Sequence, residues 1–204
     1  MLEQLNPTAV FSFFEKLSAI PHGSGNTKAI SDWCVNFARE RGLDYRQDDA
    51  NNVIIFKEAA PGYEQAPAVI LQGHLDMVCE KTPECTLDME KEGLRLQTDG
   101  EYVWAEGTTL GADNGIAVAM MLALLDAKDI PHPRVEAVVT SDEEIGLLGA
   151  AALDCSELQG SMMLNLDSEV EGILTVSCAG GVRANCHIPV ERDLCDGVLC
   201  TLEI

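Results

Sequence analysis

Three short apolar runs in this chain are each followed by imidazole or carboxylate groups, the side chains that bind divalent metal ions in proteins. The residues in question are His74 and Asp76 after the first run, Glu143 and Glu144 after the second, and Asp167 after the third. A sixth residue, Asp113, lies in the glycine-rich segment 107–115, directly before a long apolar stretch. Imidazole and carboxylate together suit Zn²⁺, Co²⁺ or Mn²⁺.

The spacing of these residues also predicts how they share the chemistry. On an extended chain His74 and Asp76 point to the same face, so Asp76 could accept the ring N–H of His74 and fix its tautomer. The several carboxylates are redundant for one ion but not for two ions that share a bridging carboxylate. Of the neighbours Glu143 and Glu144, one can bind metal while the other takes a proton from an attacking water.

Each signal alone has a simpler interpretation. A His-x-Asp pair is usually a surface or core pair, and Glu143-Glu144 is typical of a solvated acidic run or of the first turn of a helix. Asp113 is typical of a turn or helix cap, and so is Asp167. Four such signals at the ends of apolar runs nevertheless favour a metal site. The three remaining histidines are expected to be structural, namely His22, His132 and His187.

The apolar pattern predicts alternating strands and helices. Helices are expected from Asn6-Pro7 to Pro21, from Thr27 to Arg41, over Gly115–Leu125 and over Gly146–Leu153, and strands over Val53–Phe56, Ala68–Leu71, Val135–Thr140 and Met162–Leu166. Residues 94–104 predict a hairpin around Asp99-Gly100. Further strands are expected at Gly172–Ser177, Arg183–Val190 and Val198–Glu203.

This order predicts an α/β fold with a central mixed, largely parallel sheet flanked by helices. In such a sheet the carboxyl ends of parallel strands meet at one rim, which is where functional crevices lie. We expect residues 1–185 to form the N-terminal part of a catalytic domain. Residues 186–204 are expected to form a strand region that leads into a domain beyond this sequence, so the fold is expected to be incomplete at the C-terminus.

Charge and cysteine usage limit the partners and the compartment. The 204 residues carry 13 basic and 34 acidic side chains, a formal net charge of −21, which disfavours nucleic acid and anionic membrane surfaces as partners. The eight cysteines include no C-x-x-C pair, and the N-terminus has no signal-peptide pattern. A cytoplasmic protein with free thiols is therefore expected.

Four motifs carry a resemblance to a known family. The segments QGHLDMV (72–78), GTTLGADNG (107–115), TSDEEIG (140–146) and NLDSE (165–169), with SCAGG (177–181), resemble the cytosolic aminoacyl-histidine dipeptidases, which are co-catalytic zinc peptidases related to carnosinase and aminoacylase. The order and spacing hold over about residues 5–190. The combination is far more specific than any one of the motifs.

The resemblance implies a role for each site residue. His74 and Asp167 are expected to bind one Zn²⁺, Glu144 the other, and Asp113 both of them. Asp76 is expected to orient His74, and Glu143 to be the general base. The resemblance also implies a cis peptide after the bridging aspartate, here Asp113-Asn114.

The C-terminal region departs from the family pattern. Family members are more than twice as long and contain a lid domain that usually forms a homodimer and helps to bind substrate, followed by a last histidine ligand for the second metal. His187 does not match that ligand. The substrate-carboxylate binder also has no counterpart in this sequence.

The sequence thus predicts a metallopeptidase that hydrolyses dipeptides, of the Xaa-His type or of broader specificity, with two divalent ions. The 204 residues by themselves are expected to be inactive. One alternative is a non-catalytic metal-binding or interaction module derived from such a peptidase. A nucleotide-binding α/β domain ranks last, because the glycine-rich segment matches neither the P-loop nor the dinucleotide pattern.

Overall fold

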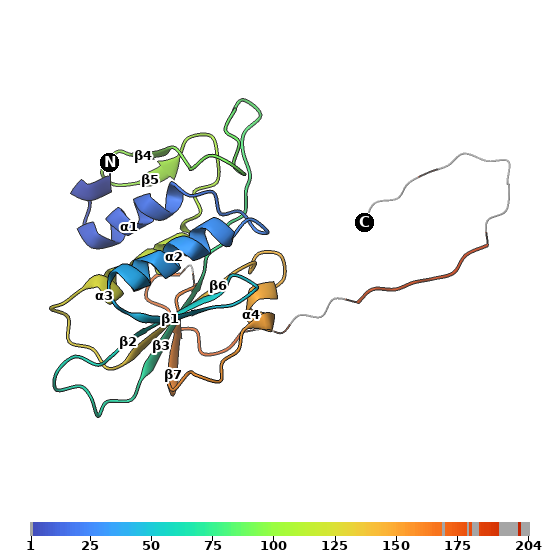
Figure 1. Ribbon diagram of the computed structural model, residues 1–204. Coiled ribbons are helices and arrows are strands. Elements are labelled where there is room, and N and C mark those ends of the chain that lie inside the picture. Colours follow the sequence, from blue (N-terminus) through green and yellow to red (C-terminus); the bar gives the residue numbers. More distant parts are fainter. Residues whose placement is uncertain (1, 169, 179, 181–183, 192–199, 201–204) are drawn as a thin grey trace. The chain divides into compact units, whose positions relative to one another are not determined.

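The computed structural model (Figure 1) describes residues 2–168, 170–178, 180, 184–191 and 200. The chain divides into two compact units, Met1–Glu169 and Val170–Ile204. All of the helices and strands that the structure defines lie in the first unit. That unit also contains every residue of the site described below.

A five-stranded mixed sheet forms the centre of the first unit. In spatial order its strands are β1 (Asp44–Gln47), β2 (Val53–Lys57), β6 (Val135–Thr140), β3 (Val69–His74) and β7 (Met162–Asn165). The pairs β6–β3 and β3–β7 are parallel, while β1–β2 and β2–β6 are antiparallel. The prediction of a central mixed sheet is therefore confirmed, although only two of its four strand pairs are parallel rather than most of them, and β6, β3 and β7 present their carboxyl ends at one rim.

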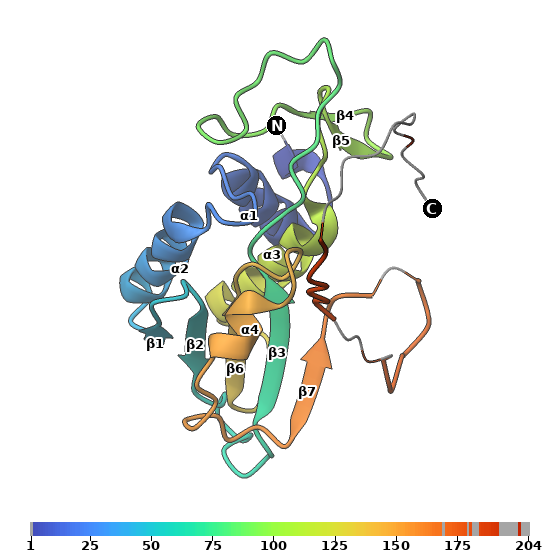
Figure 2. The same cartoon turned by 90° about the vertical axis from the view of Figure 1, so that its right-hand side faces the viewer.

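Three long helices and a short helix flank this sheet (Figures 1 and 2). The long ones are α1 (Thr8–Ser18), α2 (Lys28–Glu40) and α3 (Ala112–Asp126), and the short one is α4 (Leu148–Ala152), with a single 3₁₀ turn, η1, at Leu2–Gln4. A separate hairpin is formed by β4 (Leu96–Thr98) and β5 (Val103–Ala105). None of the helices in the described part of the chain is long and apolar enough to cross a membrane.

The two faces of the sheet are covered unequally. The main core joins the three long helices to one face, through side chains such as Ile55, Leu71 and Val139. The opposite face carries a smaller cluster of four buried residues, against which Leu153 and Leu158 pack. This second face is covered by α4 and the segment that follows it, and the edge strand β7 stays exposed along its whole length.

Close packing beneath α3 explains one glycine near the site. Helix α3 is apolar on almost every side because it contacts both α1 and β3. Gly73, in β3, faces it without a side chain, and a Cβ atom there would lie 2.3 Å from Oδ1 of Asn114. Glycine at this position therefore lets the start of α3 approach the end of β3.

Several boundaries differ from the sequence predictions. Helix α1 begins at Thr8, one residue after Pro7, and ends at Ser18 before Pro21, while α4 is shorter than the predicted Gly146–Leu153. Strand β1 was not predicted, because its sequence DYRQ lacks the apolar pattern of a buried strand. The hairpin at residues 94–104 is confirmed.

The predicted strands of the second unit are not found where it is described. Residues 173–178 and 184–190 have no regular secondary structure, so the predictions for Gly172–Ser177 and Arg183–Val190 are wrong over these residues. A strand needs a hydrogen-bonded neighbour, and these residues pair with none of the described strands. Leu174 and Val176 are accordingly 92% and 97% exposed. The segment Val198–Glu203 lies outside the described residues apart from Cys200.

Candidate metal centre

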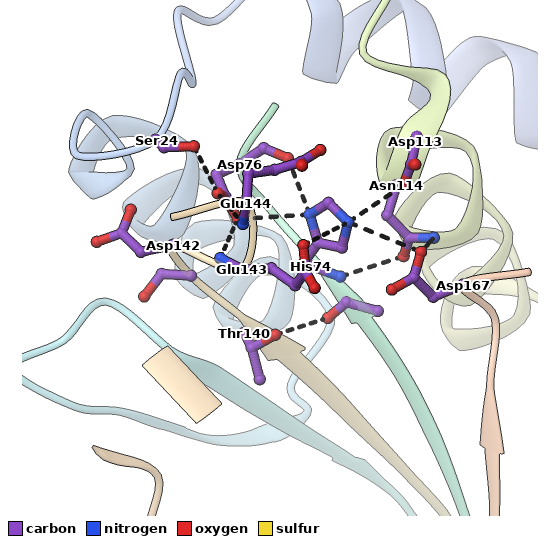
Figure 3. Close-up of polar contacts among 12 residues, drawn as sticks. Ser24, His74, Asp76, Asp113, Asn114, Thr140, Asp142, Glu143, Glu144 and Asp167 are labelled. Carbon is purple, nitrogen blue, oxygen red and sulfur yellow. Dashed lines mark hydrogen bonds and ion pairs between the residues drawn. The ribbon is translucent and has the colours of Figure 1, made fainter. Parts of the chain in front are cut away.

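The residues predicted to bind metal meet at the rim formed by the three parallel strands (Figure 3). His74 is the last residue of β3, Asp167 follows β7, and Glu143 and Glu144 lie in the loop that leaves β6. Asp113 is the second residue of α3, whose start reaches the same rim. Five residues that are distant in sequence are thus brought together by the parallel arrangement of the strands.

His74 is at the centre of this group. Its Nε2 atom lies 3.2 Å from Asp113 Oδ1, 3.9 Å from Asp167 Oδ1 and 4.0 Å from Glu143 Oε2. Potential ligand atoms lie within 4.8 Å of one another in two sets that share this histidine, one with Glu143 and Glu144 and the other with Asp113 and Asp167. Carboxylates from three segments of the chain therefore surround one imidazole, and together they form a donor set that divalent ions bind.

The other ring nitrogen of His74 has a fixed partner. Nδ1 lies 2.9 Å from the backbone carbonyl oxygen of Asp76 and 3.4 Å from its carboxylate Oδ1. A hydrogen on Nδ1 is thus donated to the carbonyl, which fixes the orientation of the ring and directs Nε2 at the acidic group. The sequence suggested the Asp76 carboxylate as the acceptor, whereas in the structure the nearer acceptor is the main chain of the same residue.

The carboxylate of Asp76 instead anchors the acidic loop. It accepts hydrogen bonds from the backbone N–H groups of Glu143 at 2.9 Å and Glu144 at 3.2 Å. The hydroxyl of Ser24 donates a third bond at 2.8 Å. Because Asp76 is buried, these bonds fix the backbone of the two glutamates relative to the end of β3.

Asn114 ties together the three elements that carry the remaining ligands. Its Oδ1 accepts the backbone N–H of His74 at 3.1 Å, and its Nδ2 donates to the carbonyl oxygen of Leu166 at 2.8 Å and lies 3.5 Å from Asp167 Oδ1. The peptide bond between Asp113 and Asn114 is cis, as the resemblance implied. The buried amide thereby sets the positions of α3 and of the chain after β7 relative to β3.

Charge accumulation shifts the pKa values of the site. Burial disfavours the ionised ring of His74, but the nearby carboxylates of Asp76, Asp167 and Glu143 outweigh it and raise its pKa to about 9. Burial also disfavours the Asp76 anion, but its hydrogen bonds lower the pKa to about 2. The pKa values of Glu143 and Glu144 are raised by burial and by neighbouring carboxylates, against the opposing charge of His74.

These residues fit a metal centre chemically. The carboxylates of Asp113, Glu143, Glu144 and Asp167 surround a single imidazole, so negative charge at the rim exceeds what His74 can neutralise. A divalent cation supplies the missing positive charge, and its ligands would be one imidazole nitrogen and carboxylate oxygens. The donor set therefore suits Zn²⁺, Co²⁺ or Mn²⁺ rather than a purely oxygen-bound ion.

Among the described residues, the three remaining histidines belong to neither ligand set, and two residues that support the site were not predicted. His22 and His132 are buried, and their Nδ1 atoms bond to the carbonyl oxygens of Ile20 and Pro133. His187 belongs to the second unit. Ser24 and Asn114 were not predicted to form hydrogen bonds at the site, and no signal in the sequence marks these bonds.

A cavity adjoins the metal-ligand group. It has a volume of about 750 Å³ and is lined by the segments 23–26, 77–80 and 89–91 together with Glu144 and Ile145. Asn26 Nδ2 donates to the carbonyl oxygen of Glu90, which links two of these segments. The site thus opens directly into a space in which a small molecule fits.

Comparison with known proteins finds that this chain is similar to peptidases. No protein-family model matches the chain. The cytosol non-specific dipeptidase of Escherichia coli is 38% identical over 192 residues, which are 94% of this chain and 40% of that protein. The crystal structure of an aminoacylhistidine dipeptidase from Vibrio alginolyticus has a TM-score of 0.82 and 43% identity over 84% of this chain and 35% of that one.

A more distant structure supports the same fold. A tripeptidase from Staphylococcus aureus has a TM-score of 0.68 and 25% identity, and covers 81% of this chain and 44% of that one. The chain therefore spans less than half the length of these relatives. It is a homologue of the aminoacylhistidine and cytosol non-specific dipeptidases that corresponds to the N-terminal part of their sequences.

Proposed function

We propose that this chain carries the metal-binding part of a dipeptidase that hydrolyses unblocked dipeptides, of the Xaa-His type or of broader specificity. The observation that carries the proposal is the meeting of His74, Asp113, Glu143, Glu144 and Asp167 at one rim of the sheet. Homology to dipeptidases supports peptide-bond hydrolysis as the reaction of this site. The substrate is then a dipeptide, held with its scissile bond at the rim.

Each ligand has a distinct place in this proposal. His74 and Asp167 would hold one ion, Glu144 would hold the other, and Asp113 would be a ligand of both. The distances of 3.2 Å and 3.9 Å from His74 Nε2 to Asp113 and Asp167 support the grouping of these three residues. Zn²⁺ is the ion we assign, with Co²⁺ and Mn²⁺ as substitutes. When bound, such ions polarise the scissile carbonyl and acidify water.

Glu143 is the proton carrier in this scheme. Its carboxylate faces the ligand group, and the raised pKa makes it a better base than an ordinary surface glutamate. It takes the proton from the attacking water and gives it to the leaving amine. Asp76 assists by holding the Glu143 backbone through its N–H group, so the carboxylate returns to the same position in each cycle.

The substrate cavity, the cellular location and the oligomeric state are also part of this proposal. The cavity beside Glu144 gives the substrate room to approach the rim. We assign a cytoplasmic location, in line with the relative named a cytosol dipeptidase. A homodimer formed through a lid domain belongs to the complete enzyme and depends on polypeptide beyond these 204 residues.

A matched pair of neighbouring substitutions tests the assignment. Zn²⁺ or Co²⁺ is titrated into the metal-free chain, and the stoichiometry and affinity are compared for Glu143→Ala and Glu144→Ala. Glu144→Ala is expected to lose one binding step, because it removes a ligand. Glu143→Ala is expected to retain the metal content of the unsubstituted chain. The same metal loss in both variants, or in neither, contradicts the assigned roles.

Turnover distinguishes the enzyme from the alternative, a non-catalytic metal-binding module. The 204-residue chain is expected to bind metal without hydrolysing dipeptides, since a last ligand and a substrate-carboxylate binder are expected beyond it. In the complete gene product, Glu143→Ala should abolish hydrolysis of a histidine-containing dipeptide. Metal binding without turnover in that complete product favours the non-catalytic module.

A further inference from the structure

Asn52 is a buried amide that belongs to none of the metal-ligand sets. It directly precedes β2 and is only 1% exposed. A polar side chain so deeply buried must form hydrogen bonds inside the protein, and where those bonds go indicates what it holds in place. All of its side-chain bonds except one lead to the loop that carries the two glutamates of the site.

The amide joins both ends of this loop. Oδ1 of Asn52 accepts the backbone N–H of Ser141 at 3.0 Å, directly after β6. Nδ2 donates to the carbonyl oxygen of Gly149 in α4 at 2.8 Å, and its second bond goes to Asp48 Oδ2 at 2.7 Å. One planar group therefore bridges residues 141 and 149, and Asp48 holds that group in its orientation.

The loop closes tightly around this amide. A Cβ atom on Gly149 would lie 2.2 Å from the carbonyl oxygen of Ser141 and 2.5 Å from Oδ1 of Asn52, so only glycine fits there. The loop also contains two residues other than glycine with positive φ, Asp142 and Leu147. Backbone hydrogen bonds from Gly149 to Ser141 and from Leu148 to Asp142 also close the loop, and Asn52 adds its bonds at the same two ends.

We propose that Asn52 is a positioning residue for the two glutamates of the metal centre. The inference rests on the proposed metal site. Asp76 binds the N–H groups of Glu143 and Glu144 in the middle of the loop, and Asn52 binds its two ends. The direction of the two glutamate side chains is thus determined by an amide that touches neither of them.

Asn52→Leu tests this role because leucine fills a similar volume without either hydrogen bond. We expect it to weaken the metal-binding step that depends on Glu144 by about 10- to 100-fold, the usual effect of removing a group that supports metal ligands. Co²⁺ titration of the 204-residue chain measures this. Asn52→Ala removes the same side-chain hydrogen bonds without adding a branched side chain; it should have a comparable effect, and it replaces the leucine variant if that variant does not fold.

Asn51→Ala is the matched control. Asn51 is the neighbouring amide in the same turn, has a φ of 69°, and contacts Thr27 rather than the acidic loop. Its substitution should lower the melting temperature without changing either metal affinity. If the Asn52 variants likewise lose thermal stability but bind metal as the unsubstituted chain does, Asn52 is only structural and the proposal is overturned.

A second measurement does not depend on metal. In the metal-free chain, the amide hydrogens of Glu143 and Glu144 should exchange about tenfold faster in the Asn52 variants than in Asn51→Ala, because the loop opens more often. Equal exchange rates overturn the proposal. If the unsubstituted chain binds no metal, the proposed metal centre fails, and this exchange measurement alone decides the role of Asn52.

Discussion

The metal centre has an inner half and an outer half that are built in different ways. The inner half, His74 and Asp76, is buried, with side chains 1% and 0% exposed, and its polar atoms are bonded to the protein. The outer half consists of Asp113, Glu143, Glu144 and Asp167. The Asp113 side chain is 58% exposed and that of Asp167 is 30% exposed.

The difference indicates which half of the metal centre is held in position by protein contacts alone, without a metal ion. Hydrogen bonds from Ser24 and from the backbone of residues 143 and 144 hold Asp76 with or without an ion. The outer carboxylates are brought together by the backbone while their charges repel one another. We infer that the inner half contributes to the stability of the metal-free protein and that the outer half depends on metal for its order.

The largest expected effect comes from removing the inner carboxylate. Asp76→Ala removes the carboxylate beside the His74 ring and leaves the Ser24 hydroxyl and the N–H groups of residues 143 and 144 without their acceptor, so it should lower the free energy of unfolding of the metal-free chain by about 3–5 kcal/mol. Asp113→Ala, in the outer half, should change it by less than about 0.5 kcal/mol. Urea denaturation in the presence of a chelator measures both. Equal losses in the two variants would remove the distinction between the halves.

The sequence was sufficient for the elements that bear the site. Buried parallel strands are continuous apolar runs, and the polar residues that follow them must lie at the sheet rim, so His74, Glu143, Glu144 and Asp167 could be placed together from local patterns. The hairpin and the long helices follow equally from local signals. The spacing did not predict the hydrogen-bond acceptor of the His74 ring. This acceptor is a main-chain carbonyl, and every residue type has one, so the sequence gives no signal for it.

The supporting residues and the edges could not be predicted in this way. Asn52 and Ser24 contact the site across distances of 89 and 52 residues, which no local pattern reports. Strand β1 is polar and lies at the edge of the sheet, so its extended conformation follows from its pairing with β2 and not from its own sequence pattern. Gly172–Ser177 has the apolar pattern of a strand but no described neighbour to pair with.

The pH dependence of the stability of the metal-free protein tests the role of the buried inner half. The pKa of His74 is raised from 6.5 to about 9, so the folded state favours the protonated ring. The stability that this provides is fully present below pH 6.5 and is lost as the pH rises through about 9, with a slope of at most about 1.4 kcal/mol per pH unit. Chelator-treated protein should therefore become less resistant to urea between pH 7 and pH 9.

His74→Gln is the control for this window. The free energy of unfolding of this variant should be lower at pH 7 and nearly constant up to pH 9. The buried thiol of Cys34, with a pKa of about 12, changes the stability only above its unfolded pKa of 9.0. At the acidic end, the lowered pKa of Asp76 provides stability above pH 3.8 that is lost as the pH falls through about 2. An unchanged slope in His74→Gln would assign the alkaline loss to another group.

The smallest expected effect lies in the outer half. Glu144→Gln removes one repelling charge from a solvent-exposed position, so the metal-free chain should gain about 0.5 kcal/mol, the scale of exposed charge interactions. The pKa of Glu143 should fall, because the Glu144 carboxylate is one of the neighbours at the crowded rim; NMR titration of its carboxyl carbon measures this. Glu101→Gln, in the β4–β5 turn, is the control and should change neither quantity. A loss of stability in Glu144→Gln would mean that the protein already stabilises this carboxylate without metal, and the outer half would then resemble the inner one.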